Sequence, residues 1–472
     1  MTTAKQINSR QGIPAASTRE RRWFWAILAA ALFMRLLVVS FEFQKPVMQF
    51  YSHPWEMGLL ANSLIHGLGY SSPFGVPTGP TAFIAPGYPT IVAGIFLLFG
   101  AYTSKSALVI VLLNVAAALG TIALIMRLAR RLFGIAAAYI AGTVWAVSLP
   151  VLWLPVIFWE SNLSALFFVT MLTLALRTRG APTGANWILL GAFTGVAALI
   201  NPALIFSFVA IMGWVAVEAW LAARANPSNT ASVIRWKPPV LGVLALTAVF
   251  IAWPIRNAVR FHAFIPLRST VGFEMWMGNR AGATGRLDES IYPMLNQHEL
   301  DLYKAQGEVA YIHGKSAAAW SYIGSHPAWF TAMTTRRIFR FWSGTGNVDG
   351  SPLYEAHALA TTLLGLLGLG LLYRRNRSLA VLFALPLLLF PLPYYMTHAE
   401  FRYRLNLDPV LTLLAGYAAM RVVAAVRTRR SRPTLHAAIP QPSRPSSECL
   451  GTGRSKPNAV NPSAPRVSRV NN

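Results

Sequence analysis

The chain has 472 residues, of which 54% are hydrophobic and 12% are charged, and its formal net charge is +25. Soluble domains carry about 25% charged residues, so the long apolar runs separated by short basic loops predict a protein that crosses a membrane several times. The one cysteine, Cys449, excludes a disulfide within the chain and a cysteine-based metal site. Because the basic residues gather in short loops and in a polar C-terminal tail, we expect them to face anionic lipid and not nucleic acid.

The N-terminal residues 1–22 are polar and carry five basic residues against one acid. The apolar run 23–41 follows without a small-residue cleavage site, which favours a retained membrane anchor over a removed signal peptide. Arg35 lies inside this run, and we interpret it as a snorkelling or interhelical arginine.

Ten apolar segments approach the length of about 20 residues that a helix needs to cross a bilayer. In chain order they are residues 23–41, 107–126, 134–152, 161–176, 187–200, 203–221, 239–253, 357–372, 378–396 and 405–423. The shorter apolar segment 88–100 is expected to form an interfacial or half-inserted helix. With ten crossings the positive-inside rule holds at every short loop and both termini are cytoplasmic. An eleventh crossing at 88–100 would move the arginines of residues 127–131 outside.

This topology predicts an all-α integral membrane protein whose polar loops gather on the external face. The larger external loop has about 100 residues, and within it residues 306–325 and 328–342 show helical spacing. The second of these segments combines aromatic residues with arginines, as expected for a helix on a membrane surface. The expected organisation is a basic cytoplasmic N-terminus (1–22), a transmembrane domain (23–424) with a first external loop (42–106) and a large external loop (256–355), and a disordered basic cytoplasmic tail (425–472).

Glu56 is the first candidate for a catalytic residue. It is one of two acids in the first external loop, and it follows Pro54, which suits the first position of a helix. A carboxyl group near apolar surface has a raised pKa when it is buried, and this suits it to general-base chemistry. The alternative is that Glu56 only stabilises a helix N-terminus through the helix dipole.

Glu160 is the second candidate, and it follows Trp159 in an aromatic, apolar sequence at the end of a span. Ionisable groups at such a depth are costly to bury and are usually functional. The alternative is an interfacial carboxylate that pairs with a nearby arginine.

A third group, between the last two spans, contains His398, Arg402, Tyr403 and Arg404. The planar guanidinium of arginine donates two hydrogen bonds to a phosphate, so these arginines are candidates for phosphate binding. The alternative is a pair of snorkelling arginines that anchor a helix end.

The large external loop begins with Arg256 and continues through Arg268, Glu274 and Asn279. Arg256 either binds a substrate phosphate or anchors the seventh span. Glu274 and Asn279 either contact substrate or form hydrogen bonds within the loop.

Taken in chain order, these features resemble the polytopic glycosyltransferases of the C-type fold. The most similar groups are those related to protein O-mannosyltransferases and to the transferase that adds aminoarabinose to lipid A, and the resemblance covers about residues 20–425. It rests on Glu56 and on the motifs Gly67-Leu-Gly-Tyr-Ser-Ser-Pro-Phe74, Pro86-Gly-Tyr-Pro89, Arg130-Arg-Leu-Phe-Gly134, Trp159-Glu160, Pro254-Ile-Arg-Asn257, Ile265-Pro-Leu-Arg268, Gly278-Asn279, His326-Pro327 and Arg402-Tyr-Arg404.

The resemblance implies an inverting transfer of a sugar from a polyprenyl-phosphate carrier to an acceptor outside the cytoplasm, in a bacterial inner membrane. Glu56 would deprotonate the acceptor, and Glu160 would be the second acid of the site. The implied ligands of the lipid phosphate are Arg402 and Arg404, with Arg256 or Tyr88. The other implied substrate-binding residues are Tyr403, Arg268, Glu274, Asn279 and His398.

The expected partners are a polyprenyl-phosphate-linked sugar, the lipid bilayer and an acceptor that is a protein, a lipid or a glycan. No metal-ligating residues are assigned, and a divalent cation, Mg²⁺ or Mn²⁺, stays open as a cofactor. Two rival functions are a transporter or flippase of lipid-linked saccharides and a non-catalytic membrane scaffold subunit. The transporter is disfavoured because the spans lack paired interior charges.

Overall fold

The computed structural model describes residues 17–44, 55–224, 236–345 and 351–430. Within these residues the regular secondary structure is helical, with one isolated bridge between Ser71 and Pro80, and this confirms the expected all-α class. The chain forms two compact units, residues 1–425 and 426–472, and the helices described below belong to the first unit except for the last turn of α21. The predictions for residues 1–16, Pro54 and the tail beyond residue 430 lie outside the described residues.

Seven of the described segments are long and apolar enough to cross a membrane. They are α1 (Thr18–Glu42), α5 (Ser104–Phe133), α8 (Ser161–Gly180), α10 (Leu204–Arg224), α17 (Pro352–Arg375), α18 (Arg377–Leu389) with α19 (Leu392–Met396), and α21 (Asp408–Arg430). Two further segments are bent pairs: α6 (Ile135–Val147) meets α7 (Leu149–Trp153) and η1 (Leu154–Val156) at 58°, and α11 (Lys237–Phe250) meets α12 (Ala252–Phe261) at 43°. These segments coincide with nine of the ten predicted crossings.

The tenth predicted crossing corresponds to α9 (Gly184–Ile200), an apolar helix of 17 residues. The segment expected to be interfacial forms α4 (Gly87–Phe99), which has 13 residues. Both helices are shorter than the usual length of a transmembrane helix, so the count of ten crossings and the interfacial position of α4 stay predictions.

Glycines allow two pairs of helices to pack backbone against backbone. A Cβ atom added to Gly191 of α9 would lie 1.8 Å from the carbonyl oxygen of Gly242 in α11. A Cβ atom on Gly368 of α17 would lie 2.1 Å from the carbonyl oxygen of Leu414 in α21. Small residues at such contacts hold helices together in lipid, where burying apolar side chains contributes little.

The break between α6 and α7 is stabilised by a side chain of α1. Arg35 is fully buried, and its guanidinium donates hydrogen bonds to the carbonyl oxygens of Trp145 (3.2 Å) and Ala146 (3.1 Å) at the end of α6. A helix end leaves carbonyl groups without partners, and in an apolar bundle these groups need another donor. Of the two interpretations of Arg35, snorkelling or interhelical, the structure therefore supports the interhelical one.

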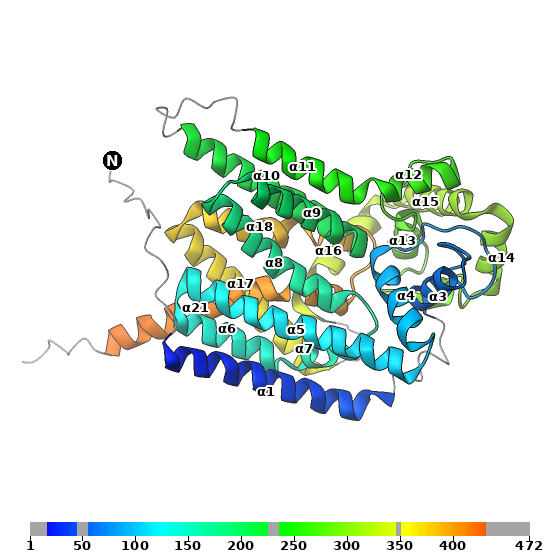
Figure 1. Cartoon of the computed structure of the whole chain (residues 1–472). Helices are drawn as coiled ribbons and strands as arrows, with labels where there is room; N and C mark the ends of the chain where they lie inside the picture. Colours follow the sequence, from blue (N-terminus) through cyan, green and yellow to red (C-terminus); the bar gives the residue numbers. More distant parts are fainter. Residues whose placement is uncertain (1–16, 45–54, 225–235, 346–350, 431–472) are drawn as a thin grey trace, which may run out of the picture. The chain divides into compact units, whose positions relative to one another are not determined.

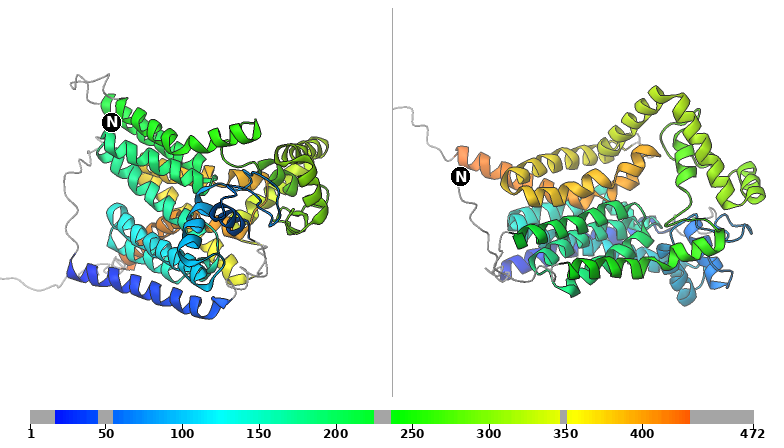
Figure 2. Two further views of the ribbon diagram at one scale, coloured as in Figure 1. Left: turned by 45° about the vertical axis from the view of Figure 1, so that its right-hand side comes forward. Right: turned by 90° about the horizontal axis from the view of Figure 1, so that it is seen from above.

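Short helices gather at one end of the long helices (Figures 1 and 2). They include α3 (Glu56–Ile65), α4, α12, α13 (Val271–Gly278), α14 (Gln297–Gln306) and α15 (Glu308–Ser325). α15 and α16 (Pro327–Ser343) coincide with the two helical segments predicted in the large external loop.

Two side chains fasten the loop after α3 to these helices. Glu308 accepts hydrogen bonds from the Thr81 hydroxyl (2.5 Å) and the Ala82 amide (2.8 Å). Arg256 donates to the carbonyl oxygens of Tyr70 (2.8 Å) and Thr81 (2.7 Å). The loop is thereby fixed against α12 and α15, and α3 is held in a defined position beside it.

Candidate functional site

A cavity of about 1310 Å³ lies among α3, the connection from η1 to α8, α13 and the short helix α20 (Phe401–Leu405). Seven of the predicted site residues line it: Glu56, Glu160, Arg268, Glu274, His398, Arg402 and Tyr403. Much of the remaining wall is aromatic or aliphatic and includes Trp153, Phe158, Trp159, Phe206, Trp320 and Tyr394. The cavity therefore places charged groups in an apolar environment, where interactions between charges are stronger than in water.

Glu56 is the first residue of α3, and its side chain is buried at the cavity wall. Burial raises the pKa of its carboxyl group to about 7, and the positive charge of Arg402 limits the rise. At neutral pH a large fraction of Glu56 is therefore ionised, and a large fraction still carries its proton. A pKa near the working pH is the value that suits a general base.

Glu160 precedes α8 and lines the same cavity. One oxygen of its carboxyl group is buried and has no hydrogen-bond partner among the described residues. Burial raises the pKa of this carboxyl group, and the charges of Arg402 and Arg268 oppose the rise. Glu160 is thus a second buried acid at the cavity.

Arg402 presents its guanidinium to the cavity from α20. The guanidinium carbon lies 4.6 Å from the centre of the Trp159 ring and 5.4 Å from that of the Tyr403 ring. It forms no ion pair with any residue that the structure describes. Cation–π contacts orient an arginine without neutralising its charge, so Arg402 retains a charge that an anionic ligand can use.

Arg268, Glu274, His398 and Tyr403 form a second group of polar side chains in the site, and Tyr403 also lies beside Arg402. Arg268 pairs with Glu274 at 3.3 Å, and Nδ1 of His398 lies 3.2 Å from the second oxygen of Glu274. The other ring nitrogen of His398 lies 3.0 Å from the Tyr403 hydroxyl. Burial lowers the pKa of His398, which keeps the ring neutral at physiological pH. The charge of Arg268 is consequently compensated within the protein.

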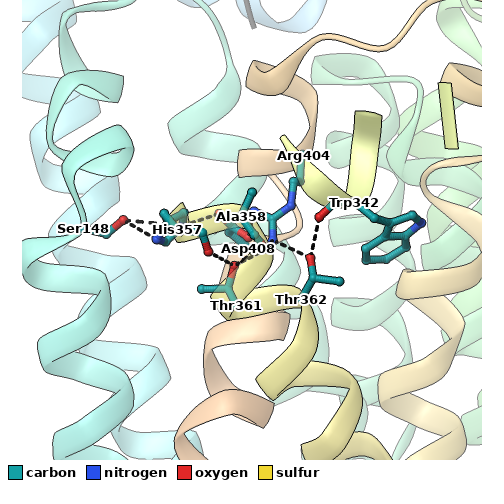
Figure 3. Close-up of polar contacts among 8 residues, drawn as sticks. All are labelled: Ser148, Trp342, His357, Ala358, Thr361, Thr362, Arg404 and Asp408. Atoms are coloured by element: carbon teal, nitrogen blue, oxygen red, sulfur yellow. Dashed lines mark hydrogen bonds and ion pairs between the residues drawn. The ribbon is translucent and has the colours of Figure 1, made fainter. Parts of the chain in front are cut away.

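The structure places Arg404, a predicted phosphate ligand, away from the cavity. Its side chain is fully buried and forms an ion pair with Asp408. It also donates hydrogen bonds to the carbonyl oxygen of Ala358 (2.9 Å) and the hydroxyls of Thr361 (2.7 Å) and Thr362 (3.0 Å) (Figure 3). A guanidinium with these partners is not available to a ligand in the cavity.

Replacing Arg404 with methionine is expected to lower the free energy of unfolding by about 3–5 kcal/mol, because Asp408 would keep a buried charge without its ion-pair partner. Unfolding of the detergent-solubilised protein by denaturant measures the change. Arg336→Met, at an exposed position of α16, is the control for loss of an arginine. Equal stability of the two variants would contradict the expectation.

Three other predicted site residues do not line the cavity. Arg256 binds the loop carbonyls of Tyr70 and Thr81, so it anchors the loop instead of a phosphate. Asn279 is fully buried and donates to the Met396 carbonyl oxygen at 2.8 Å. Tyr88 is fully buried with its ring beside Trp55.

Several polar lining residues were not indicated by the sequence, namely Glu42, Glu289, Tyr292, Tyr394 and Asn406. Tyr394 stacks on Tyr403 with ring centres 4.5 Å apart. Asn406 lies just after the Arg402-Tyr-Arg404 motif, so proximity in sequence was a usable indication for this residue. Glu289 and Tyr292 lie in an irregular loop around η2 (Glu289–Ile291), where no periodic pattern indicates which side chains point inward.

The described residues include no group of three or more His, Cys, Asp or Glu side chains placed to hold a metal ion.

No protein-family model matches the chain, and no curated protein sequence does. Among solved structures it is similar to the archaeal oligosaccharyltransferase AglB from Archaeoglobus fulgidus in complex with an inhibitory peptide and a dolichol-phosphate, with 12% identity and a TM-score of 0.49 over 88% of this chain and 52% of that one. It is also similar to ArnT from Cupriavidus metallidurans bound to undecaprenyl phosphate, with 16% identity and a TM-score of 0.37 over 87% of this chain and 80% of that one. The chain spans about half the length of the archaeal enzyme.

Proposed function

We propose that the chain is a membrane glycosyltransferase that moves a sugar from a polyprenyl-phosphate carrier to an acceptor on the external side. The observation that carries the proposal is the meeting of Glu56, Glu160 and the unpaired Arg402 in one largely apolar cavity. This combination supplies a candidate base, a second acid and a cation for phosphate. The cavity that holds them is lined in part by α10, a candidate membrane span.

The charges of the cavity fit a sugar linked to a single phosphate. Arg268 is already paired with Glu274, whereas Arg402 has no carboxylate partner among the described residues. A sugar phosphodiester carries one negative charge, which a single guanidinium can match with two hydrogen bonds. When the bond to the sugar breaks, the leaving phosphate gains a second negative charge, and Arg402 would stabilise the transition state more than the bound substrate.

Glu56 is the proposed general base. As the acceptor hydroxyl attacks the anomeric carbon, the Glu56 carboxylate would take its proton while the phosphate leaves on the opposite side of the sugar. Burial raises the pKa of both Glu56 and Glu160, and this lessens the repulsion between these carboxyls and a phosphate. Glu160 would then accept a hydrogen bond from a sugar or acceptor hydroxyl with its unpartnered oxygen.

The apolar lining suits the isoprenoid chain of the carrier. Phe206 lies in the apolar helix α10 and Val271 in α13, and their side chains are exposed by 59% apiece. A polyprenyl chain in contact with such side chains would bury apolar surface on both partners, at about 25 cal/mol per Å².

A transfer assay tests the proposal. Membranes that contain the protein are given a radiolabelled polyprenyl-phosphate sugar pool, and label is counted in protein, lipid and glycan fractions against membranes that lack the protein. We expect protein-dependent transfer that unlabelled undecaprenyl phosphate inhibits. Absence of transfer above the control by correctly inserted protein would overturn the proposal.

The rate of transfer is expected to rise with pH through about 7 and to level off above it. The pKa of Glu56 is raised from 4.5 to about 7, so the carboxylate that accepts the proton is formed only as the pH passes this value. The dependence of kcat/KM on pH in the range of about 5.5 to 8.5 measures the effect. A rate that is constant over this range, or that falls as pH rises, would be inconsistent with Glu56 as the base.

A further inference from the structure

Hydrogen bonds and an ion pair connect Ser148, His357, Asp408 and Arg404 in a continuous chain of polar side chains outside the cavity lining (Figure 3). Arg404 of α20 pairs with Asp408 at the start of α21, and the second oxygen of Asp408 lies 2.9 Å from Nε2 of His357 in α17. The other ring nitrogen, Nδ1, lies 2.9 Å from the hydroxyl of Ser148. The chain therefore joins α20, α21 and α17 to the break between α6 and α7.

The hydrogens of this chain have a consistent assignment. Asp408 offers only acceptors, so Nε2 of His357 carries a proton and donates it to Asp408. With a neutral ring, Nδ1 is then an acceptor, and the Ser148 hydroxyl donates to it. At the other end, the hydroxyl of Thr362 accepts from Arg404 and donates to the carbonyl oxygen of Trp342 at 2.8 Å. Hydrogen-bonded side-chain networks in a protein interior restrict the geometry of their members.

The two ends of the chain lie at two of the segments that carry charged groups into the cavity. α20 has only five residues and carries Arg402 and Arg404 two positions apart, with Arg402 lining the cavity and Arg404 buried in the bundle. The other segment runs from Ser148 through α7 and η1, of five and three residues, to Glu160. Helices this short are not stable by themselves, so their orientation is set by the contacts that they make.

We propose that Ser148, His357, Asp408 and Arg404 are positioning residues that fix Arg402 and Glu160 relative to each other. The inference rests on the proposed function, because it assigns these residues to the geometry of the transfer reaction. None of them lines the cavity, so each acts through Arg402 or through the segment that leads to Glu160. Misplacement of reacting groups by about 1 Å can lower a rate by about 100-fold, which gives such a network a measurable effect on the chemical step.

Other hydrogen bonds also hold the segment that leads to Glu160. Asn114 donates hydrogen bonds to the carbonyl oxygens of Pro155 and Ile157, both at 3.0 Å, and Asn162 donates to that of Leu154 at 2.9 Å. These bonds hold η1 against α5 and α8. The hydrogen bond of Ser148 adds a polar connection from this segment to α17 and α20, beside the contact of Arg402 with Trp159. We expect its loss to disturb the relation between the two cavity charges and not the fold of η1.

The first test compares Ser148→Ala with Ser148→Thr, which keeps a hydroxyl. Thr121→Val is the matched control, since Thr121 is also buried but donates only to the Ala117 carbonyl oxygen within α5. We expect Ser148→Ala to lower kcat by about 10-fold or more, Ser148→Thr to recover most of the loss, and Thr121→Val to behave as the wild type. A purely structural role for Ser148 would lower the thermal stability and leave kcat per folded molecule unchanged, and that result would overturn the inference.

A double-mutant cycle shows whether Ser148 acts through Arg402. If it does, Ser148→Ala has a smaller effect on kcat in an Arg402→Lys background than in the wild type. If Ser148→Ala lowered kcat by the same factor in both backgrounds, the inference would be contradicted.

A binding measurement separates this inference from the proposed function. Undecaprenyl phosphate is titrated onto the purified protein in detergent, and Ser148→Ala and Asp408→Asn are compared with the wild type and Thr121→Val. We expect weaker binding only in the first two variants, because Arg402 would be displaced. If the wild type binds the lipid phosphate but transfers no sugar, the proposed function fails while this comparison still tests the positioning. Wild-type binding of undecaprenyl phosphate by folded Ser148→Ala and folded Asp408→Asn would overturn the positioning inference.

Discussion

Replacing Glu56 with glutamine is expected to reduce sugar transfer by about 10²–10⁴-fold, the range that a positioned general base contributes. Glutamine keeps the size and hydrogen-bonding capacity of the side chain but cannot accept the proton of the acceptor. Glu56 is the cavity acid whose pKa burial raises to about 7, so its loss removes a base suited to neutral pH. Initial rates of transfer from a labelled polyprenyl-phosphate sugar measure the effect.

Two comparisons make this result specific. Binding of undecaprenyl phosphate to Glu56→Gln should match that of the wild type, which would show that the cavity is intact. Asp301→Asn, at an exposed position of α14, makes the same change of charge outside the cavity and should leave the rate unchanged. Wild-type transfer by Glu56→Gln would remove Glu56 from the base role, and Glu160→Gln would then be the variant to examine.

Replacing Arg402 with glutamine is expected to lower kcat/KM by about 100-fold or more, with weaker binding of the carrier phosphate as one component. Its guanidinium is held over the Trp159 ring and has no carboxylate partner within the described chain, so nothing else in the cavity replaces its charge. Steady-state kinetics over a range of carrier concentrations separate the loss of binding from the loss in kcat.

Arg402→Lys refines this experiment, because lysine keeps the charge but not the planar pair of donors. An intermediate rate would indicate that geometry as well as charge is used. Arg336→Gln, at an exposed position of α16, is the control for removal of an external arginine. If Arg402→Gln bound undecaprenyl phosphate as tightly as the wild type, Arg402 would not be the phosphate ligand.

The sequence was sufficient to predict most of the helices and the gathering of several site residues. Apolar runs of near-transmembrane length located nine of the segments, and the positive-inside rule assigned Glu56, Glu160 and Arg402 to the same side before their contacts were known. Helical spacing also located α15 and α16. These predictions succeed because they depend on local pattern and on the sign of charge, which are properties of the sequence itself.

The separate roles of Arg402 and Arg404 were not predictable from the motif that contains both. Two residues on a five-residue helix point in different directions, and which of them faces the bundle is decided by Thr361 and Thr362, more than 40 positions earlier in the chain. A partial indication existed, because Asp408 follows Arg404 by four residues and such pairs meet on a helical turn. Arg256 had no comparable indication, since its partners are backbone carbonyls of a distant loop.

The packing of α9 against α11 has a consequence for the membrane around the protein. At 1.5 Å per residue, the 17 residues of α9 extend about 25 Å, less than the roughly 30 Å of a bilayer's hydrocarbon core. The close approach of Gly191 to Gly242 prevents α9 from shifting independently to adjust for this hydrophobic mismatch. If α9 crosses the bilayer as predicted, thinning of the lipid beside it is one way to accommodate the mismatch. Asn201 and Pro202 follow the end of α9 and line the cavity, so a local dip of the external leaflet would bring lipid headgroups down to the level of the cavity at this side of the protein.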